Sequence, residues 1–319
     1  MSPAAARSSS ARYTSGRRTV TANDNASSVA KFSATSNPCR GDSATSASTI
    51  WSSNDRRFSL IVTMRIPIAR VAVICGLIMA VTIGGPSTAA TPPLRGELTV
   101  SAAASLTESF TRIGRQFRRE HPGIRLRFNF ASTSSLVSQI QAGAPVDVFA
   151  SADLSSQDRL AASGNITSAP RVFARNTMQI AVKPGNPLAI KGVGDLTRVG
   201  VIGLCGRTVP CGVYAASVLA LNKTNVPESQ ITRGTDAKAT LASVAVGDAN
   251  AAIVYVTDVR AAGKAVSGVA IPARQNVRAI YGVSVVRGSA NRAAAQAFIN
   301  YLLGQEGQAT LKSFGFLAP

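Results

Sequence analysis

The sequence has few of the side chains from which catalytic and metal sites are usually built. Among its 319 residues there is one histidine, His121, and there are four cysteines. A histidine-based metal site or a Ser-His-Asp triad therefore has little material to draw on. Aromatic residues make up only 5% of the chain. This composition favours a binding protein over an enzyme.

Acidic residues are also scarce, because 15 Asp and Glu stand against 34 Lys and Arg and leave a net charge of +19. Eleven of the basic and three of the acidic residues lie in residues 1–95, so +8 of the charge belongs to this first segment. The other basic residues are spread singly, without the basic stripe or interleaved aromatic residues of a nucleic-acid groove. We expect no nucleic-acid partner.

Residues 64–90 have the pattern of an export signal. From Met64 a short basic region precedes the 15-residue apolar run VAVICGLIMAVTIGG and a small-residue exit. This run is shorter than the roughly 20 residues of a membrane-spanning helix. We therefore predict a signal peptide over residues 64–90, cleaved near Ala90, and an exported, periplasmic or cell-envelope protein. Residues 1–63 are expected to be disordered, either as a long leader or as a stretch before a true start at Met64.

From Gly96 onward, short apolar strands alternate with amphipathic helices, which is typical of an α/β fold. The first strand is followed by a helix that carries Leu106, Phe110 and Phe117 at helical spacing. Ser105 and Glu108 have the spacing of a capping box at the start of that helix. In open α/β sheets, ligands bind beyond the carboxyl ends of the strands. The turns between a strand and the next helix are therefore the places to search for a site.

Four such turns offer hydroxyl groups and backbone N–H groups but almost no charge. Each places unpaired N–H donors at a helix start, which favours an anion. Taken singly, each has a structural explanation, since Ser105 and Asp236 also suit helix N-caps. The first of these turns contains Ser105, and the other three cover residues 130–136, 209–214 and 234–241.

The segments AAASLTES, FASTSSLVSQIQAGAPVDVFASAD, VPCGVY, AIVYVTDV and the terminal FGF occur in a fixed order. In order and spacing they resemble the molybdate-binding proteins of ABC importers, and the resemblance covers residues 96–319. It implies a type II periplasmic-binding-protein fold, with two α/β lobes of mixed sheet flanked by helices and a hinge between them. The first lobe would comprise residues 96–178 and 280–319, and the second residues 179–279.

The resemblance also implies how an oxyanion would be held, by hydrogen bonds alone. The family's second serine falls on Thr133, which keeps the hydroxyl group but adds a methyl group. If the alignment shifts by one residue, Ser134 takes this role. A core tyrosine is the alternative interpretation of Tyr255. The implied ligands are the hydroxyl groups of Ser105, Thr133 and Tyr255 and the backbone N–H groups of Cys211 and Ala237.

A shell of N–H and O–H donors suits a fully deprotonated tetrahedral dianion, which presents only acceptors. Phosphate near neutral pH keeps a proton that needs an acceptor, and an unpaired buried polar group costs about 1–3 kcal/mol. We therefore expect molybdate or tungstate as the ligand, with molybdenum held only as molybdate and no cofactor. The expected partner is a membrane permease of an ABC importer, and the chain is expected to be a monomer.

Two other functions remain open. Sulfate or another tetrahedral oxyanion satisfies the same donors, and its separation from molybdate depends on cavity size. An envelope enzyme is the more distant alternative, in which acid–base groups would come from Asp147, Asp153, Asp158, Ser105 and Tyr255. These residues show no spacing that indicates a nucleophile, a base and an orienting group.

Two cysteines, Cys205 and Cys211, lie in the exported part of the chain, six residues apart on one loop. In an oxidising compartment this spacing predicts a disulfide. A metal pair or a redox site is the alternative, although the pair lacks the C-x-x-C form of the usual redox motif.

Overall fold

The computed structural model describes residues 93–319. The predicted leader over residues 1–63, the signal peptide over residues 64–90 and its cleavage near Ala90 lie outside the described residues. Within residues 93–319 no helix has both the length and the apolar character needed to cross a bilayer.

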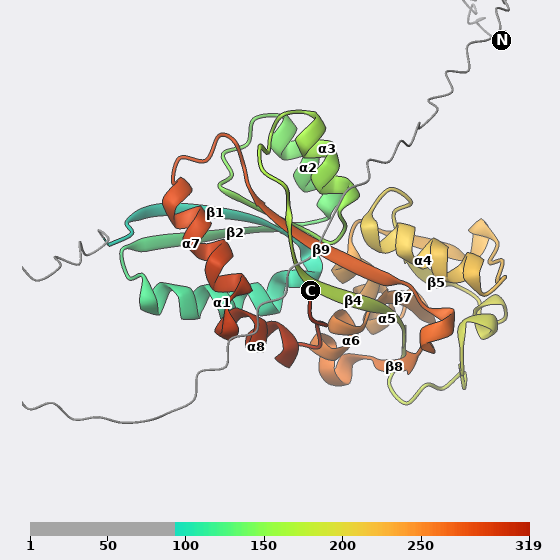
Figure 1. Ribbon diagram of the computed structural model, residues 1–319. Coiled ribbons are helices and arrows are strands. Elements are labelled where there is room, and N and C mark those ends of the chain that lie inside the picture. The colour runs from blue at the N-terminus through green and yellow to red at the C-terminus, as the bar shows by residue number, and fades with distance from the viewer. Residues whose placement is uncertain (1–92) are drawn as a thin grey trace, which may run out of the picture. The chain divides into compact units, whose positions relative to one another are not determined.

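The first lobe is built on a mixed sheet in which β1 lies between β2 and β3 and pairs with both in parallel. The strand β9 then pairs antiparallel with β3 and with the first half of β4. Five helices flank this sheet (Figure 1). The elements are β1 (Gly96–Ala103), α1 (Thr107–Glu120), β2 (Ile124–Ala131), α2 (Thr133–Gln141), β3 (Val148–Ser151), α3 (Ser155–Ala162), β4 (Arg171–Val182), β9 (Arg278–Val285), α7 (Arg292–Leu303) and α8 (Gln305–Ser313).

The second lobe continues from the other half of β4, which pairs antiparallel with β7 and β8. The strand β5 pairs in parallel with β6 and β7. The elements are β5 (Ile202–Cys205), α4 (Pro210–Leu221), β6 (Ile231–Gly234), α5 (Ala237–Val246), β7 (Ala251–Tyr255), α6 (Val256–Ala262) and β8 (Ser267–Ala270).

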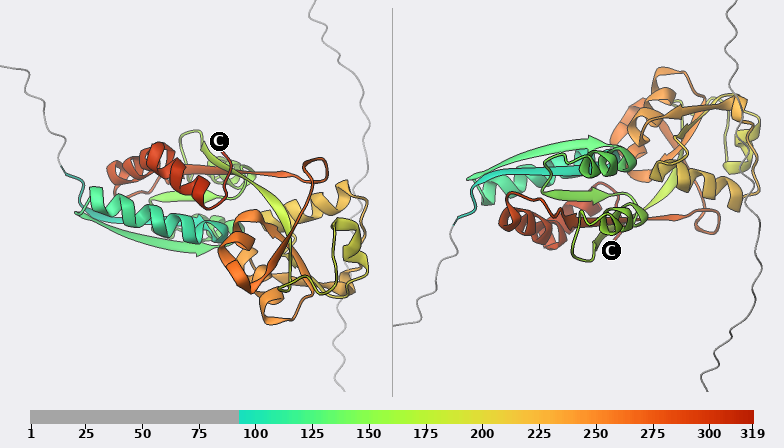
Figure 2. Two further views of the ribbon diagram at one scale, coloured as in Figure 1. Left: turned by 90° about the horizontal axis from the view of Figure 1, so that it is seen from below. Right: turned by 90° about the horizontal axis from the view of Figure 1, so that it is seen from above.

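The long strand β4 changes partners part-way along its length. Residues 171–177 pair with β9, whereas residues 178–182 pair with β7. Figure 2 shows β4 and β9 running between the lobes in two further views. Two neighbouring strands therefore form the connection between the lobes, which is the architecture of the predicted hinge.

The core of the first lobe explains why its helices form where they do. Phe110 and Phe117 of α1 are fully buried, as their helical spacing predicted. The rings of both pack against Phe298 of α7, at centroid distances of 6.0 and 5.4 Å. Edge-to-face contacts of this kind are favourable beyond the area that they bury. This packing fixes the position of α1, and with it the turn that carries Ser105.

Candidate functional site

A pocket lies between the lobes, where helices begin after strands of both sheets. The space open to the centre of a water-sized sphere is about 10 Å³, far below the 300–1,000 Å³ of pockets for drug-sized ligands, so the pocket suits only a small ligand. Among residues 93–319, Asp236 is the only charged residue that lines it. All five residues expected to bind an oxyanion line it. The full lining comprises Ala103, Ala104, Ser105, Ser132, Thr133, Ala152, Val209, Pro210, Cys211, Asp236, Ala237 and Tyr255.

Ser105 does not cap α1, so the predicted capping box with Glu108 is wrong. A 3₁₀ turn over residues 104–106 separates Ser105 from the helix, which has no side-chain cap bond. The hydroxyl group of Ser105 instead lies 2.9 Å from that of Tyr281. Asp236 does act as the expected N-cap, since its carboxylate accepts the Ala239 N–H at 2.9 Å.

The Thr133 hydroxyl group accepts a hydrogen bond from the backbone N–H of Ala152 at 3.2 Å. Its own proton is therefore free to point into the pocket. Ser134, the alternative position, does not line the pocket, because its hydroxyl group is turned away and donates to the Thr208 carbonyl at 2.8 Å. This bond joins α2 of the first lobe to the turn before α4 of the second.

Tyr255 ends β7 with its side chain buried, as a core tyrosine would be. Its hydroxyl group, however, is buried without a hydrogen-bond partner among residues 93–319. Buried hydroxyl groups are normally paired, and an unpaired one costs about 1–3 kcal/mol. An unpaired hydroxyl group on a pocket residue points to a partner that enters from outside the chain.

The backbone N–H groups come from the first turns of α4 and α5, where an α-helix has no acceptor of its own. Cys211 and Ala237 occupy these turns and line the pocket. The predicted disulfide between Cys205 and Cys211 is present and ties the start of α4 to β5. Gly212 reinforces the same turn, because a Cβ atom there would collide with the carbonyl group of Gly206.

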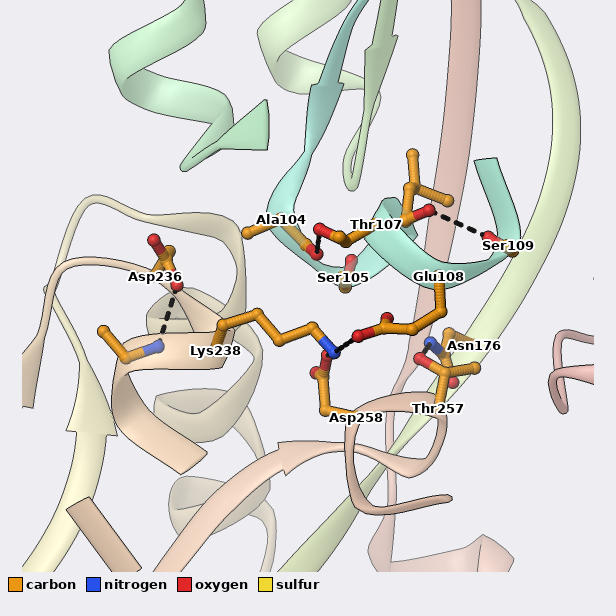
Figure 3. A network of polar contacts seen from close by, with 12 residues as sticks. Ala104, Ser105, Thr107, Glu108, Ser109, Asn176, Asp236, Lys238, Thr257 and Asp258 are labelled. Carbon is orange, nitrogen blue, oxygen red and sulfur yellow. Dashed lines mark hydrogen bonds and ion pairs between the residues drawn. The ribbon is translucent and has the colours of Figure 1, made fainter. Parts of the chain in front are cut away.

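Three charged side chains form a cluster behind the pocket (Figure 3). The Lys238 ammonium lies 2.7 Å from a Glu108 carboxylate oxygen and 3.7 Å from one of Asp258. Glu108 lies in the first turn of α1, so this ion pair joins the two lobes. Asp258 is fully buried, and neither carboxylate oxygen has a hydrogen-bond partner of normal geometry in the described part of the chain.

A family model for bacterial extracellular solute-binding proteins matches residues 98–317. The chain belongs to this family. The molybdate-binding protein ModA of Mycobacterium tuberculosis is 33% identical over 255 residues, which cover 76% of this chain and 97% of that protein. This relative confirms the resemblance to molybdate-binding proteins that the sequence motifs indicated.

Two solved structures of solute-binding proteins confirm the predicted type II fold. The periplasmic molybdate-binding protein of Azotobacter vinelandii has a TM-score of 0.62 at 20% identity, and the match covers 70% of this chain and 99% of that one. The sulfate-binding protein SubI of Mycobacterium tuberculosis has a TM-score of 0.63 at 18% identity, with 70% and 86% covered. At these identities the likeness shows the fold alone.

The structure does not bring the acidic residues of the enzyme alternative into the pocket of this solute-binding protein. Asp147 accepts hydrogen bonds from the Thr99 N–H and the Ser289 hydroxyl group. The Asp153 carboxylate accepts a hydrogen bond from the backbone N–H of Ser156 in the first turn of α3, and Asp158 lies on that helix. None of the three lines the pocket with Ser105 and Tyr255.

Sequence reasoning missed Tyr281, Asn176, Lys238 and the carboxylate of Asp258. Tyr281 lies in β9, and nothing in its local sequence marks it as a partner of Ser105. The only sequence signal for Lys238 was its position one residue after Ala237, in a turn that was already a candidate for anion binding. Its partner Glu108 lies 130 residues away in the sequence.

The buried Asp258 should make folding stability depend on pH. Burial raises the pKa of this carboxyl from its usual 3.8 to about 7, and the Lys238 ammonium offsets this only in part. Because the folded form holds the proton more tightly, this contribution to stability is fully present below pH 3.8 and is lost as the pH rises through about 7. At about 1.4 kcal/mol per pKa unit, the whole effect is about 4 kcal/mol.

Asp258→Asn removes this titration. In urea unfolding between pH 4.5 and 8, the free energy of unfolding of the wild type should fall relative to that of the variant as the pH rises. Lys238→Met should move the midpoint of this fall to higher pH. Parallel curves for the wild type and Asp258→Asn would contradict the interpretation.

Proposed function

We propose that this solute-binding protein captures molybdate or tungstate outside the cytoplasm and delivers it to the permease of an ABC importer. The observation that carries the proposal is the pocket between the lobes, lined by two helix starts and by Tyr255, whose hydroxyl group has no partner among the described residues. No cationic side chain of residues 93–319 lines this pocket. The sequence relationship to the Mycobacterium tuberculosis molybdate-binding protein supports the choice of ligand.

In this proposal the oxyanion accepts hydrogen bonds from hydroxyl and backbone N–H groups only. Partial positive charge at the starts of α4 and α5 favours a dianion there. Neutral donors also avoid a buried ammonium or guanidinium group that would be left unpaired when the ligand departs. The five donors are the hydroxyl groups of Ser105, Thr133 and Tyr255 and the N–H groups of Cys211 and Ala237.

Molybdate fits this donor set better than phosphate does. The Thr133 hydroxyl group accepts from the Ala152 N–H, and the Ser105 hydroxyl oxygen lies within hydrogen-bond distance of the Tyr281 hydroxyl group, so both can turn their own protons toward the ligand. Molybdate accepts these protons, whereas hydrogen phosphate brings a proton that needs an acceptor. Sulfate is the second candidate, because it satisfies the same donors. The 33% sequence identity to the molybdate-binding protein ModA of Mycobacterium tuberculosis supports molybdate over sulfate.

Capture would close the lobes over the anion. We place the lobes at residues 96–178 with 280–319 and at residues 179–279, with β4 and β9 as the hinge. The Lys238–Glu108 ion pair and the Ser134–Thr208 hydrogen bond join the lobes and would break on opening. The protein acts as an exported monomer, without a cofactor, nucleic acid or catalysis.

A thermal-shift panel tests the choice of ligand. With an anion at about 1,000 times its dissociation constant, binding adds about 4 kcal/mol, which raises the Tm by roughly 8–16 °C for a domain of this size. Molybdate and tungstate should give such a shift, and phosphate at the same concentration should give little. If sulfate at the same concentration matched molybdate, the proposed specificity would be wrong.

Tyr255→Phe tests the site itself. Loss of one hydroxyl donor to a charged ligand should weaken molybdate binding by about 1–3 kcal/mol, measured by isothermal titration calorimetry. Tyr301→Phe is the matched control, because its hydroxyl group bonds Glu306 outside the pocket and its loss should leave the affinity unchanged. An unaltered affinity of Tyr255→Phe would return Tyr255 to a purely structural role.

A further inference from the structure

A chain of buried polar groups leads from the strands that connect the lobes to the pocket wall. Asn176 of β4, Tyr281 of β9 and Ser105 are at most 4% exposed. The Asn176 amide nitrogen lies 3.4 Å from the Tyr281 hydroxyl oxygen, which lies 2.9 Å from that of Ser105. Only Ser105 of these three lines the pocket.

The orientation of Asn176 is determined by its neighbours. Its side-chain oxygen accepts the Thr177 N–H at 2.9 Å, so the amide nitrogen faces Tyr281 and the Thr257 hydroxyl group, which lies 2.8 Å away. Figure 3 shows Asn176 and Thr257 side by side. Since an amide NH₂ group only donates, the hydroxyl oxygen of Tyr281 accepts from it.

This arrangement leaves Tyr281 with one proton to donate. Burial raises the pKa of Tyr281, so the phenol keeps that proton. Ser105 is the remaining hydrogen-bond partner of Tyr281 among residues 93–319. If Ser105 donated to Tyr281 instead, the buried phenol proton would have no acceptor among residues 93–319, and an unpaired buried donor is unfavourable. The hydrogen bond therefore runs from Tyr281 to Ser105.

A hydroxyl group that accepts from Tyr281 must turn its own proton elsewhere, and for Ser105 this direction is the pocket. Thr133 is held in the same way by the Ala152 N–H. The two hydroxyl groups differ in one respect. The donor to Thr133 belongs to the backbone, whereas the donor to Ser105 belongs to a side chain that can be replaced.

We propose that Tyr281, oriented by Asn176, is a positioning residue that fixes Ser105 as a hydrogen-bond donor and so makes the site select anions that carry no proton. The inference rests on the proposed oxyanion function and deepens it. With Ser105 and Thr133 both fixed as donors, the O–H of hydrogen phosphate would face another O–H. Without the phenol oxygen, Ser105 can rotate and accept that proton.

The test compares two dianions, molybdate and hydrogen phosphate, at pH 8 by calorimetry, with phosphate measured by competition against molybdate. Tyr281→Phe should weaken molybdate binding about tenfold while phosphate binding is unchanged or stronger. The ratio of the two affinities should therefore fall at least tenfold. Tyr301→Phe should keep the wild-type ratio.

Asn176→Asp provides a second, opposite change. A carboxylate at this position accepts the Tyr281 proton, so Tyr281 then accepts from Ser105 and Ser105 can no longer donate to the ligand. The added negative charge repels both dianions alike and cancels in the ratio, which should again fall at least tenfold. This variant carries the test if Tyr281→Phe does not fold.

The outcomes separate this inference from the proposed function. If the wild type does not bind molybdate, the proposed function fails before any variant is compared. If the wild type binds molybdate and the folded variants lose affinity for both anions by the same factor, Tyr281 has only a structural role and the inference is overturned.

Discussion

Hydrogen-bond donors that the protein itself does not satisfy converge on one small space between the lobes. A helix start provides N–H groups without intrahelical acceptors, and the pocket is lined by the first turns of α4 and α5. The unpaired hydroxyl group of Tyr255 adds to them. These groups are costly to bury without an acceptor, and the same cost makes an anion that brings only acceptors a favourable occupant. The disulfide, the close packing of Gly212 and the aromatic contacts of α1 all serve to hold these donors in place.

Apart from Asp236, which lines the pocket, the charged side chains near it form a separate cluster. The cluster of Lys238, Glu108 and Asp258 contains one cation and two carboxyl groups, and it lies behind the donors rather than among them. Lys238 is used to join the two lobes and is not one of the residues that line the pocket. A site without a direct cation can bind a dianion through dipoles and still release it when the lobes separate, since no unpaired buried charge is left behind.

Much of the fold could be predicted from local patterns. The strand β1 and the helix α1 follow from an apolar run and from the helical spacing of Phe110 and Phe117. The first half of β4 cannot be predicted from such a pattern, because Arg171, Arg175 and Asn176 interrupt its apolar residues, and its strand is completed by pairing with β9. The helix α6 has only seven residues, too few to show a periodicity.

The candidate site also combines features that local motifs indicate with contacts that they do not. The five residues expected to bind the oxyanion lie in or beside turns whose motifs are local, so the sequence could indicate them. The capping box failed because a 3₁₀ turn precedes α1, which a spacing rule cannot detect. The partner of Ser105 lies 176 residues away, and the partner of Lys238 lies 130 residues away. Contacts of that kind depend on how the lobes meet, and no short pattern encodes them.

A crystal structure of the molybdate complex tests the central claim most directly. The account predicts the molybdenum atom in the pocket between the lobes, with its oxygens at hydrogen-bond distance from the N–H groups of Cys211 and Ala237 and from the hydroxyl groups of Ser105, Thr133 and Tyr255. A molybdate held by an arginine or lysine side chain, or bound away from these helix starts, would contradict it.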